Sequence, residues 1–72
     1  MDNRLLLKFT SQDDKSPIYI EVNQIVAFLP DGYNIDKTVI HTTSGRDFFV
    51  LEPINKVEKD IRNGWYLGKS NY

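Results

Sequence analysis

Cysteine is absent from this 72-residue chain, and histidine, methionine and tryptophan each occur once. Without cysteine the chain can form neither a disulfide nor a thiolate metal site, and one histidine cannot supply a histidine-rich zinc site. The sequence therefore predicts no metal and no cofactor. A chain of this length forms one domain with a small core. Small domains often need an added stabilising element such as a disulfide, a metal or a partner chain. Because the disulfide and the metal are excluded here, a partner chain remains, and we expect self-association.

Long apolar runs and a strong net charge are also missing. The run Leu5–Leu7 is too short for a signal peptide core or a membrane span, so we expect a soluble, cytoplasmic protein with no membrane insertion. The net charge of −1 argues against general affinity for nucleic acid. The charge is uneven: residues 1–36 carry a net −3 and residues 37–72 a net +2. A bipolar surface of this kind suits association, although ordinary scatter also explains it.

Glycine is scarce and scattered. Its four positions are Gly32, Gly45, Gly64 and Gly68. A phosphate-binding loop needs closely spaced glycines at a strand-to-helix turn, and this spacing excludes one.

Alternation of apolar and polar residues predicts five strands, at residues 4–9, 18–22, 25–29, 38–43 and 46–51. The last two are joined by Ser44-Gly45, a tight-turn signal. The apolar run Ile25–Leu29 lacks strict alternation, which indicates burial on both faces or an oligomer contact. Asn23-Gln24, just before it, indicates a bend or bulge.

After Glu52 the period changes to that of a helix, expected over residues 53–63. Ile54, Val57 and Ile61 form one stripe that should dock on the sheet, and Pro53 suits the first helical turn. Asn63-Gly64 is typical of the C-terminal end of a helix. We therefore expect residues 64–72 to form an aromatic and polar tail. The fold class predicted is α+β: a curled, mostly antiparallel sheet of about five strands, with an open small barrel as one form of it, and one C-terminal amphipathic helix.

Catalytic groups are few. His41 is flanked by hydroxyl residues in a strand, where we expect a half-buried or solvent-facing histidine, with a catalytic or pH-sensing role as the alternative. The carboxylates Asp13-Asp14, Asp31 and Asp36 lack the spacing of a calcium loop and read as solvated turns. We therefore expect a protein that is not an enzyme.

Large apolar residues outside the expected core are the best candidates for an interaction site. Such residues either fold back onto the core or anchor a partner. The candidate interaction residues are Tyr33, Arg62, Trp65, Tyr66 and Leu67, and the candidates for self-association are Val26 and Phe28. The leading hypothesis is a protein-interaction module that forms a homo-oligomer or binds a protein partner.

The alternative hypothesis is nucleic-acid or nucleotide binding through the C-terminal half. A basic and aromatic face can track phosphates and stack bases. The candidates are Arg46, Lys56, Lys59, Arg62, Lys69, Trp65, Tyr66 and Tyr72. The plainer interpretation is that Lys56 and Lys59 form the solvated side of the helix, interleaved with Glu58 and Asp60.

The stretch from Ile18 to Ile61 resembles the FlbD-like family of small bacterial proteins associated with the flagellum. The matching pieces are Ile18-Tyr19-Ile20, Ile25 with Phe28, Thr38-Val39-Ile40-His41-Thr42-Thr43-Ser44-Gly45, and Phe49-Val50-Leu51-Glu52 leading to Val57 and Ile61. The resemblance implies a small bacterial β-rich protein without catalytic residues. The chain is also similar, more weakly, to the β-rich DNA-binding domain of LytTR response regulators.

Overall fold

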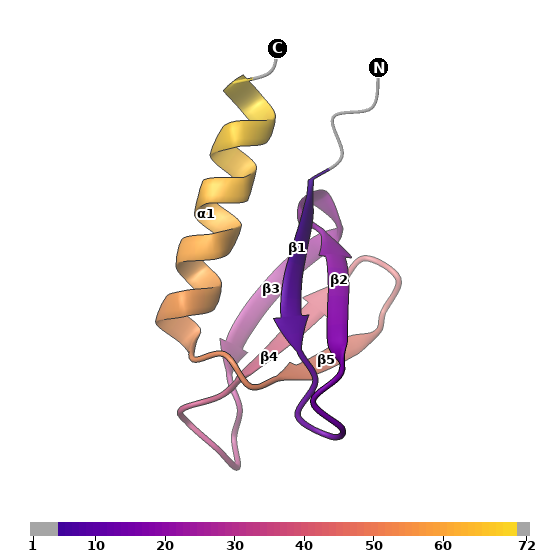
Figure 1. Cartoon of the computed structure of the whole chain (residues 1–72), viewed down its shortest axis with the longest axis vertical. Helices are drawn as coiled ribbons and strands as arrows, with labels where there is room; N and C mark the ends of the chain where they lie inside the picture. Colours follow the sequence, from indigo (N-terminus) through magenta and orange to yellow (C-terminus); the bar gives the residue numbers. More distant parts are fainter. Residues whose placement is uncertain (1–4, 71–72) are drawn as a thin grey trace.

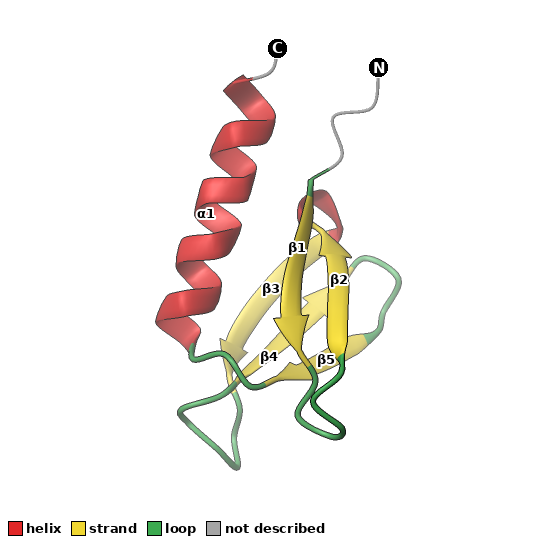
Figure 2. Cartoon of the chain, viewed as in Figure 1, coloured by secondary structure: helices red, strands yellow, loops and turns green. Residues whose placement is uncertain are grey.

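The computed structural model describes residues 5–70 of the chain, with side-chain positions for residues 5–64. Its elements, in chain order, are β1 (Leu6–Thr10), β2 (Pro17–Glu21), the short 3₁₀ helix η1 (Val22–Gln24), β3 (Ile25–Pro30), β4 (Thr38–Thr42), β5 (Asp47–Val50) and α1 (Ile54–Ser70) (Figure 1). The α+β class and the five strands are confirmed (Figure 2). The bend expected at Asn23-Gln24 is the 3₁₀ turn η1.

The strands form two antiparallel sheets, so the prediction of one curled sheet is wrong. β1 pairs with β2, and the second sheet has the order β3-β4-β5. η1 separates β2 from β3 and ends the first hairpin. Backbone hydrogen bonds join the two sheets where β1 ends: Ser11 and Val50 form an isolated bridge, and the Leu51 N–H donates to the Thr10 carbonyl at 2.9 Å. The two sheets do not close into a barrel.

The β4–β5 hairpin follows the predicted turn chemistry. Gly45 has φ +85°, a left-handed conformation that glycine adopts without the strain of a Cβ. Its N–H donates to the Thr42 carbonyl at 3.0 Å, and the Thr42 N–H donates to the Arg46 carbonyl at 3.1 Å. The tight turn therefore fixes the register of β4 on β5.

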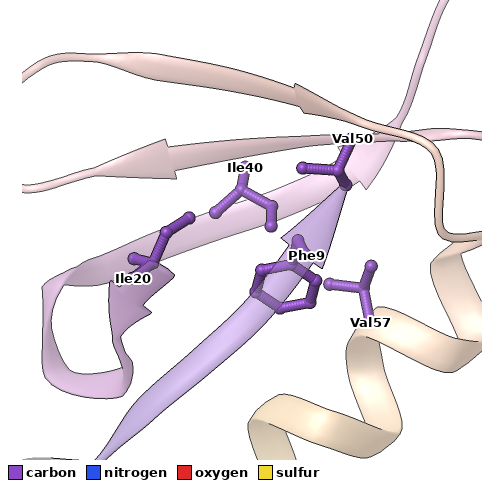
Figure 3. Close-up of a cluster of buried hydrophobic side chains, with 5 residues drawn as sticks. All are labelled: Phe9, Ile20, Ile40, Val50 and Val57. Carbon is purple, nitrogen blue, oxygen red and sulfur yellow. The ribbon is translucent and has the colours of Figure 1, made fainter. Parts of the chain in front are cut away.

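The core lies between the sheets and the helix. Five buried side chains from four strands and the helix form it: Phe9, Ile20, Ile40, Val50 and Val57 (Figure 3). In Figure 3 the Phe9 ring lies beside Val57 of the helix and below Ile40 and Val50 of the sheet. Val57 is fully buried and Ile61 packs against the cluster, so the helix docks through its predicted stripe.

The helix does not end at Gly64, so the predicted boundary and the predicted tail are wrong. α1 continues through Gly64 to Ser70. Gly64 is buried, and a Cβ placed on it would lie 3.0 Å from Leu5 Cδ2 and 3.1 Å from Leu7 Cδ2. The missing side chain thus lets the helix approach the start of β1. Glycine costs about 1 kcal/mol in a helix interior, and close packing offsets that cost.

Candidate interaction surface

The outer face of the β3-β4-β5 sheet carries a row of apolar side chains. The register places Leu29 opposite Val39 and Val39 opposite Phe49, so these three neighbours share one face. Alternation points Ile40, the next residue of β4, into the core on the other face. Leu29 and Phe49 are 42% and 48% exposed, and Val39 between them is 8% exposed. We call Leu29, Val39 and Phe49 the outer row.

A second row on the same face borders the outer row. It consists of Ala27, His41 and Asp47. His41 Nδ1 contacts Asp47 Oδ1, and both side chains are partly exposed. The single histidine is therefore a half-buried sheet residue whose ring faces a carboxylate across the β4–β5 pair. The pair gives the apolar row a polar border.

The loop between β3 and β4 holds its conformation through Asp31. This side chain is buried; its carboxylate accepts hydrogen bonds from the Tyr33 N–H at 2.9 Å and from Gln12 Nε2 at 3.1 Å. The Asp31 N–H donates to the Lys37 carbonyl at 3.0 Å, which closes the base of the loop. The Tyr33 N–H and then the Gln12 amide lower the pKa of Asp31 below its ordinary value of 3.8. Asp31 is thus a structural anchor and not a solvated turn residue.

Two large apolar side chains project from this anchored loop. Tyr33 is 97% exposed and Ile35 is 81% exposed. The Lys37 N–H donates to the Asn34 carbonyl at 2.8 Å, which fixes the returning half of the loop. We call residues 31–37 the tyrosine loop. An ordered loop that leaves its two largest apolar side chains in solvent is a typical interaction element.

A pocket of about 320 Å³ lies between the β1–β2 turn and β5. Ile18, Phe48 and Phe49 supply its apolar lining, and Asp13, Asp14 and Ser16 are among its polar residues. We call it the turn pocket. The Asp14 carboxylate accepts hydrogen bonds from the Ser16 Oγ at 2.7 Å and the Ser16 N–H at 3.1 Å. These bonds, the side-chain one first, lower the pKa of Asp14 below 3.8.

The predicted basic residues are distributed over two elements, and most are engaged. On α1, Lys56 pairs with Asp60 and Arg62 pairs with Glu58, both at 2.6 Å. Arg46 lies immediately before β5, and its guanidinium carbon is 5.1 Å from the centre of the Phe48 ring. The Lys56 and Lys59 side chains are exposed on the helix with Glu58, as expected for its solvated side.

The remaining predicted site residues fall in three places. Val26 is exposed at the irregular pairing between Ile25 and Ala27 in β3, while Phe28 packs against the core. Burial of this strand on both faces is therefore wrong. Trp65, Tyr66 and Leu67 lie on the last turns of α1, not beyond its end, and their side chains lie outside the described residues. The side chain of Lys69 and all of Tyr72 also lie outside them.

Sequence reasoning missed Leu29 and Phe49 as surface residues. Both occur in apolar runs, where the exposed and buried members look alike. Phe49 could have been found from the β4–β5 turn. The turn sets the pairing of the two strands, and that pairing places Phe49 on the same face as Val39.

Comparison of the chain with protein-family models, with curated proteins and with solved structures finds no match. The FlbD-like assignment therefore stays a prediction. Among the described residues, no group of three or more histidine or acidic side chains is placed to hold a metal ion. No helix in the described part of the chain is long and apolar enough to cross a membrane.

Proposed function

We propose that this protein is a non-enzymatic interaction module that associates with a second copy of itself through the outer face of the β3-β4-β5 sheet. The observation that supports this most is the outer row, because it places half-exposed Leu29 and Phe49 on either side of Val39. Aligned packing of two sheets through apolar faces is a standard way to bury such a row. From the sequence resemblance we further propose that the protein is bacterial and cytoplasmic and belongs to the FlbD-like family.

The size of the row sets the expected strength of association. Full burial of a leucine or phenylalanine side chain gains roughly 1.5–3 kcal/mol, so covering the exposed half of each gains about 1 kcal/mol. Four such side chains in a symmetric pair yield about 4 kcal/mol, equivalent to a Kd near 1 mM. Loss of translational and rotational freedom opposes this gain. The row alone is therefore too small, and other contacts must contribute.

Substitution in the outer row tests the proposal. Leu29→Ser removes an apolar side chain from the proposed contact and should raise the dissociation constant for self-association about thirtyfold, since roughly 1 kcal/mol is lost in each copy. Sedimentation velocity over a concentration series measures it. Leu6→Ser is the matched control, because Leu6 is a leucine of similar exposure on the other sheet. Equal effects of the two substitutions, or a wild-type chain that is monomeric at high micromolar concentration, would contradict the proposal.

Nucleic-acid binding is the alternative that the sequence leaves open, and we do not favour it. Lys56 and Arg62 are each paired with a carboxylate on the same helix. Those pairs reduce the positive potential that phosphate contacts require.

A further inference from the structure

His41 is the only histidine of the chain, and it lies on the face that self-association would cover. We propose that the His41–Asp47 pair makes self-association depend on pH, because each pair takes up one proton when a second copy covers it. This inference rests on the proposed function and names the regulation of the same face. Association then strengthens as the pH falls through the range in which histidine titrates.

The strand register fixes the pair on the outer face, one row from the apolar contact. His41 follows Val39 by two residues in β4, so both side chains project from the same face. Asp47 lies opposite His41 in β5, as Phe49 lies opposite Val39. His41 Nδ1 contacts Asp47 Oδ1, and the two side chains are 39% and 46% exposed. A second copy on this face therefore meets a solvated imidazole and carboxylate at the border of the outer row.

An interface large enough to be stable must extend over this pair. The outer row alone gives too little apolar burial, so the contact has to continue beyond it. Two residues of a strand span only about 7 Å, whereas a standard interface buries about 800 Å² of each partner, a patch roughly 30 Å across. Such a patch centred on Val39 includes His41 and Asp47, whichever way the second copy is oriented.

The charge of this part of the face depends on the imidazole alone. Across the strand pairs from His41, Asp47 is the one charged group in the described part of the chain, since β3 presents an alanine there. The Arg46 guanidinium lies over the Phe48 ring, and Phe48 packs against the core on the other face. Lys37 precedes β4, beyond the outer row and four residues from His41. The pair therefore carries one negative charge with a neutral imidazole and none with an imidazolium.

Burial makes these two protonation states unequal in free energy. A symmetric interface encloses two pairs, and with neutral imidazoles it encloses two carboxylates without a cation, which is costly. An imidazolium and a carboxylate instead form a charge-assisted hydrogen bond with no net charge. The covered pair therefore binds a proton more tightly than the exposed pair. The state that binds more protons gains stability as the pH falls, so low pH favours the associated state.

Sedimentation velocity over a concentration series at about pH 8 and about pH 5.5, on either side of the histidine range, tests the inference. We expect the dissociation constant of the wild type to be at least about tenfold lower at the lower pH, since one proton taken up by each copy changes it by up to about a hundredfold per pH unit. His41→Gln keeps a hydrogen-bonding side chain that does not titrate. Its dissociation constant should be equal at the two pH values.

Asp47→Asn separates a local effect of charge from a general one. Without the carboxylate, protonation leaves an imidazolium with no counterion in the interface, so this variant should associate more weakly at the lower pH than at the higher. Glu58→Gln makes the same change in net charge at an exposed position of α1, which packs on the core side of the sheet. It should keep the pH dependence of the wild type.

Self-association with one dissociation constant at both pH values would overturn this inference and leave the proposed function standing. A pH dependence that persists in His41→Gln would overturn it too. So would a reversal in Glu58→Gln as well as in Asp47→Asn, because that result shows a general charge effect. A wild-type chain that is monomeric at high micromolar concentration at both pH values would overturn both proposals.

Discussion

Asp31 shows how one residue can hold a surface in place. Its backbone N–H closes the base of the tyrosine loop, and its carboxylate bonds to the Tyr33 N–H and to Gln12 Nε2. Gln12 Nε2 also donates to the Val50 carbonyl at 3.1 Å, which ties the loop to β5. The sequence marks Asp31 only as a turn residue, since the partners that bury it are distant in the chain.

The pH dependence of stability tests this role. The pKa of Asp31 is lowered in the folded protein, so its carboxylate stabilises the fold fully above the ordinary value of 3.8. That stabilisation is lost as the pH falls through the folded value. Urea unfolding should therefore show Asp31→Asn less stable than the wild type at pH 7, with the difference shrinking below about pH 3.8.

Asp36→Asn controls for the loss of a charge in the same loop, because Asp36 is exposed and its carboxylate accepts no hydrogen bond within residues 5–64. It should leave the free energy of unfolding at pH 7 nearly unchanged. A constant difference between Asp31→Asn and the wild type from pH 7 down to pH 2 would contradict the role given to the carboxylate.

The elements differ in how far the sequence predicts them. The β4–β5 hairpin follows from Ser44-Gly45, and the docking stripe of α1 follows from Val57 and Ile61, since turn chemistry and periodicity are local. The end of α1 could not be predicted, because a glycine at a C-cap and one at a close approach look the same. The split into two sheets also depends on pairings between distant residues, which no local pattern encodes. The exposure of Leu29 was missed for that reason too, because it depends on the pairing of β3 with β4, whereas Phe49 could have been assigned by alternation from the β4–β5 turn.

Gly64 provides a test at the level of packing between elements. The free energy of unfolding of Gly64→Val should be about 1–3 kcal/mol lower than that of Gly64→Ala, because the larger side chain must displace Leu5, Leu7 and Val22. Urea denaturation measures the difference.

The control variants are Lys59→Val and Lys59→Ala, on the exposed side of α1, where the two side chains differ in helix propensity alone. Their free energies of unfolding should differ by less than about 0.7 kcal/mol. Equal differences at the two positions would show that α1 does not lie close to β1.

For the whole molecule, the small core and the outer row lead to the same conclusion. Five buried side chains hold two small sheets and one helix together, and the outer face leaves half-exposed leucine and phenylalanine beside a buried valine. A partner chain that covers this face would add apolar burial to a domain that has little. The sequence predicts the need for a partner from length and composition. It does not predict the face, because that depends on the strand register.

The most direct test of the central claim is an isotope-filtered NOE experiment on a mixture of labelled and unlabelled chains at high micromolar concentration. Only protons from different copies within about 5 Å give signals, a distance in the range of direct side-chain contact. We predict intermolecular signals between the methyl groups of Leu29 or Val39 and the Phe49 ring of the other copy. Intermolecular signals confined to other surfaces, such as Leu6 and Tyr19 on the β1–β2 sheet, or none at all, would contradict the account.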